Sequence, residues 1–313
     1  MKRLVLLMVT IFAFLSCQKD GEVRSNATND YEIGKNRFTL NSNGDVREYY
    51  VHLPVSYNES EAIPVVFMLH GSSGDGERFY NISGWKEVGE IENILTIFPS
   101  SWEYCKQFPN GSQGITTKWN IYADDASYCP GQNPRDDIHF LRDIIDQLNE
   151  KFNIDSRRTY LVGFSNGGAM ALRCAMEMSD IFAAVVESAG STSIEATYLP
   201  NRNIPVTYQI GNANKDGVPP LPMQSLDSLL NTSPFKRTIA THINSFDLES
   251  TYTLSGDSND IITATYKGIS DSVLEFNVRL IKDLEHNYPN GINHPMKGAE
   301  VNWEWLKQFS LPE

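Results

Sequence analysis

The chain has 313 residues, of which 41% are hydrophobic and 21% charged, enough apolar sequence for one large domain or two small ones. Its formal net charge is -13, with 39 Asp and Glu against 26 Lys and Arg. Because nucleic acids and anionic membrane surfaces select basic patches, this balance argues against either as a partner.

The amino terminus has the pattern of an export signal. The positive stretch MKR precedes a twelve-residue apolar run at 4–15, which is too short to span a bilayer, since that needs about 20 residues. The run ends in Leu-Ser-Cys, which resembles the bacterial lipoprotein processing site. We therefore expect residues 1–16 to be a signal peptide and Cys17 to be the lipidated first residue, although cleavage nearby with Cys17 uninvolved is the alternative. Residues 17–30 are polar and predict a flexible tether.

Eight extended segments follow, and together they predict a sheet. Two alternating runs at 37–41 and 47–54, joined by a turn sequence, predict a β-hairpin. Six continuous apolar runs, typical of buried parallel strands, lie at 64–71, 94–100, 159–165, 183–190, 204–212 and 273–283.

Helical patterns separate several of these segments. Residues 136–152 place apolar side chains on one face, with two Asp at the start, where the helix dipole favours them. Residues 167–178 form a second, Ala- and Met-rich pattern. Alternating strands and helices after a hairpin predict one α/β domain at 31–313, with a doubly wound, mostly parallel sheet of eight strands and helices on both faces. Residues 217–270 are the least regular part and could be an insertion over the cleft.

The segment TYLVGFSNGG contains the pattern G-x-S-x-G as Gly163, Ser165 and Gly167. The pattern alone is weak, but here an apolar strand leads into it and a helical pattern begins directly after it. That strand–turn–helix context is the one required by a nucleophile elbow. We therefore expect Ser165 to be a catalytic nucleophile rather than part of an ordinary turn.

Attack by a serine creates an oxyanion that needs preorganised hydrogen-bond donors. One donor should be the backbone N–H of Asn166, directly after the nucleophile, and the other should come from the loop LHGSSGDG after the third strand. In that loop Ser72 follows the pair His70–Gly71, so its N–H is the first choice and that of Ser73 the second.

The base should be a histidine beyond the last strand, because the triad order on this kind of fold is Ser, acid, His. Of the six histidines, His286 follows the last predicted strand within three residues. His294 lies eight residues further on and is the alternative.

These segments together resemble a known family. The stretches LHGSSG, DDIHFLRDIIDQL, YLVGFSNGGAMAL, FAAVVESAGS and EHNYPNG, with KWN at 118–120, look like the α/β-hydrolase family of polyhydroxybutyrate depolymerases, feruloyl esterases and acetylxylan esterases. The resemblance runs from about residue 46 to 212 and resumes near 272. It implies a serine esterase that needs no cofactor and no metal.

The loop IGNANKDG is where the chain departs from that family. Family members usually show H-G-T-x-D after the strand that carries the acid, and this alignment puts Asn214 at the acid position. Asp216 lies two residues later, and because a surface loop tolerates extra residues, we expect Asp216 to be the acid of the triad. Asn214, or an acid from elsewhere such as Asp257 or Asp283, is the alternative.

Aromatic and cysteine residues suggest further features. Trp102 follows the fourth strand and Trp119 lies in the next long loop, both on the side of the strand carboxyl ends, where open sheets bind ligands. They could be platforms for a sugar ring or a feruloyl group, or simply pack a long loop. Cys105 and Cys129 are the preferred disulfide pair, and Cys174 should be a buried free thiol on a helix.

The sequence therefore predicts an exported serine esterase anchored by a lipid to the bacterial cell envelope, in the periplasm or on the outer surface. Feruloyl or acetyl esters on polysaccharide are the expected substrates, with a hydroxybutyrate polyester as the alternative. A carbohydrate-binding lipoprotein that kept the fold and lost turnover is the competing hypothesis. The membrane is a partner only through the lipid, and nucleic acid is not a partner.

Overall fold

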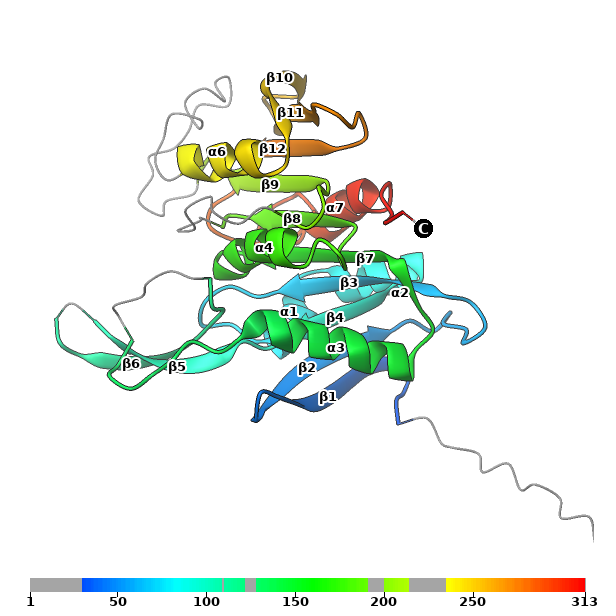
Figure 1. Ribbon diagram of the computed structural model, residues 1–313, viewed down its shortest axis with the longest axis vertical. Coiled ribbons are helices and arrows are strands. Elements are labelled where there is room, and N and C mark those ends of the chain that lie inside the picture. The colour runs from blue at the N-terminus through cyan, green and yellow to red at the C-terminus, as the bar shows by residue number, and fades with distance from the viewer. Residues whose placement is uncertain (1–29, 109, 122–127, 191–199, 214–234, 313) are drawn as a thin grey trace, which may run out of the picture. The chain divides into compact units, whose positions relative to one another are not determined.

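A mixed sheet of ten strands organises the unit formed by Glu32–Glu313 in the computed structural model (Figure 1). The structure describes residues 30–108, 110–121, 128–190, 200–213 and 235–312. In spatial order the strands are β1 (Gly34–Ser42), β2 (Asp45–Leu53), β4 (Leu95–Pro99), β3 (Ile63–Leu69), β7 (Ile154–Phe164), β8 (Ala184–Ser188), β9 (Val206–Gly211), β12 (Glu275–Ile281), β11 (Ile261–Gly268) and β10 (Leu248–Gly256).

The centre of the sheet is parallel and its edges are antiparallel. The strands from β4 through β12 pair in parallel, and β1–β2 and β11–β10 add antiparallel strands at the two edges. This confirms the doubly wound α/β-hydrolase fold class. All eight expected strands are present, but the predicted total of eight is wrong, because the sheet has ten strands. The strands β10 and β11 extend it, and their largely exposed, mixed sequences lack a strong apolar signal.

Helices cover both faces of the sheet. Figure 1 shows α3 (Asp137–Lys151), α4 (Asn166–Glu177) and α6 (Phe235–Ser245) in front of it and α7 (Gly298–Leu306) behind it. The helices α1 (Gly76–Ile82), α2 (Trp85–Glu92) and α7 share a core with one face of the central strands, to which Trp85, Trp303 and Trp305 contribute. Within the described ranges no helix is long and apolar enough to cross a membrane.

The stretch 217–270 is only partly described. From residue 235 onwards it forms α6 and the two edge strands, whereas residues 217–234 lie outside the described residues, so the insertion over the cleft stays a prediction. The predicted signal peptide, Cys17 and the predicted tether up to residue 29 also lie outside them, so these features stay predictions.

A separate hairpin of β5 (Trp102–Gln107) and β6 (Gln113–Lys118) follows β4. A disulfide joins Cys105 of β5 to Cys129, with the two Cα atoms 5.4 Å apart, which confirms the preferred pairing. Cys174 is a free, fully buried thiol on α4, as expected, and burial raises its pKa. A buried protonated thiol is a poor nucleophile, so Cys174 is a packing residue.

Candidate active site

Ser165 occupies a strained turn between β7 and α4. Its backbone has φ 54° and ψ −119°, a region that costs a non-glycine residue about 1–3 kcal/mol. Two backbone hydrogen bonds hold the turn: the Ser165 N–H donates to the carbonyl of Ser188 at 2.8 Å, and the Ala169 N–H donates to that of Ser165 at 3.0 Å. The carboxyl end of a central parallel strand thus presents the serine at the edge where ligands bind in open sheets.

The two flanking glycines are required by close packing. A Cβ atom on Gly163 would lie 2.0 Å from the carbonyl oxygen of Gly167, and one on Gly167 would lie 2.4 Å from the carbonyl oxygen of His70. The two glycines of the G-x-S-x-G pattern are thus needed because the backbones of β7, α4 and the loop after β3 pack so closely that a side chain would not fit.

His286 faces the serine from the segment after β12. Its Nε2 lies 2.9 Å from the Ser165 Oγ, within hydrogen-bond distance, and its ring packs against Phe164 with 5.1 Å between ring centroids. His294 lies elsewhere in a backbone role, since its Nδ1 accepts from the Met296 N–H and its Nε2 contacts the Lys282 carbonyl at 2.8 Å. The structure thus brings His286, and not His294, to the serine.

The expected acid and its alternative, Asp216 and Asn214, lie outside the described residues. The start of their loop is described, and it is hydrogen-bonded to the segment that leads to His286. The Asn212 N–H donates to the Ile281 carbonyl at 2.9 Å, the Asn212 Oδ1 accepts from the Asp283 N–H at 2.6 Å, and the Ala213 N–H donates to the Leu284 carbonyl at 3.2 Å.

Gly211 makes that contact possible. A Cβ atom at this position would lie 1.9 Å from the Leu284 carbonyl oxygen. The acid predicted at Asp216 lies outside the described residues, so its role stays a prediction. Asp257, one of the other acid candidates, builds the turn after β10, where its Oδ1 accepts from the Asn259 N–H at 2.8 Å.

The loop after β3 lies directly against the serine. A Cβ atom on Gly71 would be 3.1 Å from the Ser165 Cβ. The Ser73 N–H is already bonded to the Thr117 carbonyl at 2.9 Å, whereas the Ser72 N–H has no backbone acceptor among the residues that the structure describes. Asn166 is the first residue of α4, where backbone N–H groups have no partner within the helix. The N–H groups of Ser72 and Asn166 therefore stay the predicted oxyanion donors.

Trp119 connects the elbow to this loop from inside the protein. Its backbone N–H donates to the Asn166 Oδ1 at 2.7 Å, and its indole Nε1–H donates to the His70 carbonyl at 2.8 Å. The side chain is fully buried. The expectation of a substrate platform at Trp119 is therefore wrong, because its ring and both its N–H groups are committed to positioning the elbow and the loop. Trp102 is partly exposed with the Arg135 guanidinium 4.6 Å from its ring centre, and its role as a platform stays a prediction.

His70 is a buried, neutral histidine with a defined tautomer. Its Nε2 accepts from the Ser101 N–H at 3.0 Å, so its Nδ1 carries the proton and donates to the Gly71 carbonyl at 2.7 Å. Burial lowers the pKa of His70 to about 4. The ring is therefore neutral at pH 7 and fixes the loop through neutral hydrogen bonds.

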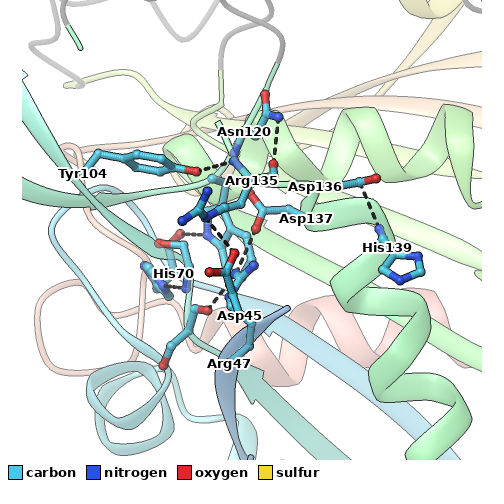
Figure 2. A network of polar contacts seen from close by, with 12 residues as sticks. Asp45, Arg47, His70, Tyr104, Asn120, Arg135, Asp136, Asp137 and His139 are labelled. Carbon is cyan, nitrogen blue, oxygen red and sulfur yellow. Dashed lines mark hydrogen bonds and ion pairs between the residues drawn. The ribbon is translucent and has the colours of Figure 1, made fainter. Parts of the chain in front are cut away.

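A buried ion pair supports the same region from β2 and α3 (Figure 2). The Arg47 guanidinium lies 2.8 Å from the Asp137 carboxylate, and both side chains are buried. The other carboxylate oxygen accepts from the Asn120 N–H at 2.7 Å, next to Trp119. Sequence patterns suggested only a helix-dipole role for Asp137, since its partner lies 90 residues away in the chain.

A second buried pair holds α6 against the sheet. The His242 Nε2 on α6 lies 2.8 Å from the Glu187 carboxylate on β8, and its Nδ1 contacts the Thr238 carbonyl. Burial raises the pKa of Glu187. This contact holds α6, the first described element after the expected acid, against β8.

In the part of the chain that the structure describes, no group of three or more His, Cys, Asp or Glu side chains is arranged to hold a metal ion.

A strained serine at a strand-to-helix turn, a histidine at hydrogen-bond distance and a parallel-centred sheet define a serine hydrolase on the α/β-hydrolase fold. The chain belongs to the family described as "Putative esterase", whose model matches residues 41–258.

Curated relatives and solved structures agree with this assignment. The chain is 28% identical over 204 residues to the putative esterase NocK of Nocardia uniformis subsp. tsuyamanensis, covering 63% of this chain and 54% of that protein. It is 24% identical over 173 residues to the bifunctional acetylxylan esterase/xylanase XynS20E of Neocallimastix patriciarum, covering 55% of this chain and 22% of that protein. The chain thus spans less than two thirds of these relatives.

Among solved structures, the acetyl xylan esterase from Aspergillus awamori superposes with a TM-score of 0.56 at 13% identity, covering 87% of this chain and 99% of that chain. A structure described as a thermostable esterase gives a TM-score of 0.54 at 16% identity, covering 88% of this chain and 63% of that chain. At these identities the superpositions support the fold alone.

Proposed function

We propose that the chain hydrolyses carboxylic esters through an acyl-enzyme intermediate on Ser165. The observation that carries the proposal is the 2.9 Å approach of the His286 Nε2 to the Oγ of a serine held in a strained elbow. A serine hydroxyl is a weak nucleophile unless a base accepts its proton, and this geometry supplies that base.

The steps follow from the positions of these groups. The Ser165 Oγ attacks the ester carbonyl carbon while its proton passes to the His286 Nε2. The backbone N–H groups of Ser72 and Asn166 stabilise the oxyanion, and the positive end of α4 adds to that field. The imidazolium then protonates the departing alcohol. In the second half, His286 takes a proton from water, which attacks the acyl-enzyme and releases the acid and the free serine.

Asp216 is proposed to orient His286 and to stabilise its imidazolium form. The proposal is supported by the start of the loop, where Asn212 and Ala213 are hydrogen-bonded to residues 281–284, the segment leading to the histidine. Asp216→Asn should lower kcat for a 4-nitrophenyl ester by up to about 10⁴-fold, as loss of a triad carboxylate does in serine proteases. Asn214→Ala should change it little, and full activity in the Asp216 variant would assign the acid to another residue.

Acetyl or feruloyl esters on polysaccharide are the proposed substrates. The proposal is supported by the names of the relatives, which include the acetylxylan esterase/xylanase of Neocallimastix patriciarum and feruloyl esterase B of Piromyces equi. A lipid at Cys17 would hold the enzyme at the bacterial cell envelope, in the periplasm or on the outer surface, where such polymers or their fragments are met. A screen of acetyl, feruloyl and hydroxybutyrate esters, with Ser165→Ala as control, separates polysaccharide esters from a polyester.

Labelling with a fluorophosphonate tests the nucleophile directly. We expect covalent modification of the purified protein at Ser165, loss of labelling in Ser165→Ala, and strongly slowed labelling in His286→Ala. His294→Ala is the matched control, since among the described residues this histidine bonds the backbone of Lys282 and Met296 and does not reach Ser165. Absence of labelling at Ser165 would favour the competing hypothesis, a carbohydrate-binding protein without turnover.

A further inference from the structure

A small pocket opens beside the catalytic pair. Its volume is about 120 Å³, and its walls come from the loop after β3, from α1, from Phe164 and from the residues after His286. The lining residues include Gly71, Ser72, Arg78, Phe79, Phe164 and Tyr288. Pockets for drug-sized ligands measure about 300–1,000 Å³, so this one suits a single small group of a substrate.

Arg78 brings the only charged side chain among the residues that line this pocket. It is exposed, and we find no ion pair or side-chain hydrogen bond of its guanidinium with any residue that the structure describes. The chain has 39 acidic against 26 basic residues, so acidic partners are in excess. Several other arginines form ion pairs with acidic side chains. Arg47, Arg142 and Arg158 each lie within 3.0 Å of a carboxylate.

The nearest acids along the chain are committed elsewhere. The Asp75 carboxylate caps α1 by accepting from the Arg78 backbone N–H at 2.7 Å. Glu77 forms an ion pair with Lys35 at 2.5 Å. The helix cap thus fixes the backbone of Arg78, and neither of these two acids pairs with its guanidinium, which can therefore bind a ligand in the pocket. A guanidinium has planar donors matched to a carboxylate, and such charge-assisted bonds are among the stronger ones in proteins.

The pocket shares one wall with the serine through Gly71, where a Cβ atom would lie 3.1 Å from the Ser165 Cβ. On its other side, Ile82 lines both this pocket and a larger groove of about 440 Å³ between α1, α2 and residues 290–300. A substrate whose reacting ester lies at Ser165 can therefore place a neighbouring group beside Arg78.

We propose that Arg78 is a specificity-determining residue that selects esters bearing a carboxylate close to the scissile bond. The proposal rests on the esterase function proposed above and narrows its substrate class to acidic esters, such as those on uronic-acid-containing polysaccharide or on dicarboxylic acids. The guanidinium binds the carboxylate, while Phe79 and Phe164 contact the carbon skeleton between that carboxylate and the ester.

Two pairs of small esters test this on the purified protein. The first pair, 4-acetoxybenzoate and its methyl ester, places the charge on the alcohol side. The second pair, 4-nitrophenyl hydrogen adipate and 4-nitrophenyl methyl adipate, places it on the acyl side. For each pair, the ratio of kcat/KM for the acid to that for the neutral ester is compared between wild type and variants, so intrinsic reactivity cancels.

We expect Arg78→Gln to lower this ratio about tenfold in at least one pair, with kcat/KM for the neutral ester changed less than twofold. Arg78→Lys should keep part of the preference, and added salt should weaken it, because the guanidinium is exposed. The pair that responds identifies the side of the ester that lies at Arg78.

Arg158→Gln is the matched control. It removes the same charge from the early part of β7, about 20 Å along the strand from Phe164, and should leave the ratio unchanged. An unchanged ratio in Arg78→Gln for both pairs, with hydrolysis retained, would overturn the specificity proposal alone. Absence of hydrolysis of all four esters, together with failed fluorophosphonate labelling, would overturn the esterase function and this proposal with it.

Discussion

Replacing His70 by asparagine should change how the stability of the protein depends on pH. An ordinary histidine has a pKa near 6.5, and burial lowers that of His70 to about 4. At a pH between these two values, His70 is protonated in the unfolded chain and neutral in the folded protein. The free energy of unfolding must therefore fall as the pH drops from 6.5 towards 4. Each pH unit in this window contributes about 1.4 kcal/mol, so the total loss from this residue is about 3 kcal/mol.

The His70→Asn variant has no such group. Its amide can still donate and accept hydrogen bonds, although it will be less stable than wild type at pH 7, since the contacts of the imidazole with Gly71 and Ser101 are lost or weakened. The advantage of wild type over the variant should shrink by about 3 kcal/mol between pH 7 and pH 4.

Urea unfolding at pH 7, 5.5 and 4, with the disulfide kept oxidised, measures this difference. His139→Asn removes an imidazole from an exposed position on α3 and controls for the number of histidines. A gap between wild type and His70→Asn that stays constant from pH 7 to pH 4 would refute the buried neutral histidine.

Two further substitutions probe the support of the site. Asp137→Asn leaves the Arg47 guanidinium buried without its charge partner and should cost about 3–5 kcal/mol in urea unfolding, whereas a loss below about 1 kcal/mol would mean that the pair relaxes into water. Gly211→Ala forces a methyl group to within 1.9 Å of the Leu284 carbonyl and should displace the segment before His286. We expect a loss of about 1–3 kcal/mol in stability together with a larger fall in kcat/KM, and unchanged kinetics would show that the acid loop and the histidine segment are not coupled.

Much of the fold could be predicted because its elements carry local signals. The eight strands of the prediction appear because each has an apolar run or a clear alternation. The strands β10 and β11 escaped prediction because their exposed faces leave only a mixed polar pattern. The serine elbow could be predicted because its signal is also local, since the strand, the glycines and the helix follow one another within about fifteen residues.

Only part of the candidate site could be predicted from the sequence. Ser165 and the proposed oxyanion donor Asn166 are neighbours in sequence, so one motif points to both. The choice between His286 and His294 depended on how the segment after β12 folds, and in the structure one ring reaches the serine while the other bonds the backbone. The Arg78 guanidinium, which has no ion pair with any residue that the structure describes, gave no signal in the sequence, because a missing charge partner is recognised only when the surroundings of the side chain are known.

Trp119 and Asp137 show most clearly what the sequence by itself could not determine. The sequence left Trp119 open between a substrate platform and loop packing, and it gave the acid at the start of the helix only a helix-dipole role. Both side chains are fully buried, one against His70 and Asn166 and the other against Arg47. The sequence determined the order of most strands and helices and the position of the strained serine elbow, because periodicity and turn chemistry act between near neighbours. Only the tertiary structure decided which distant side chains meet, because those contacts depend on how the elements pack across the sheet.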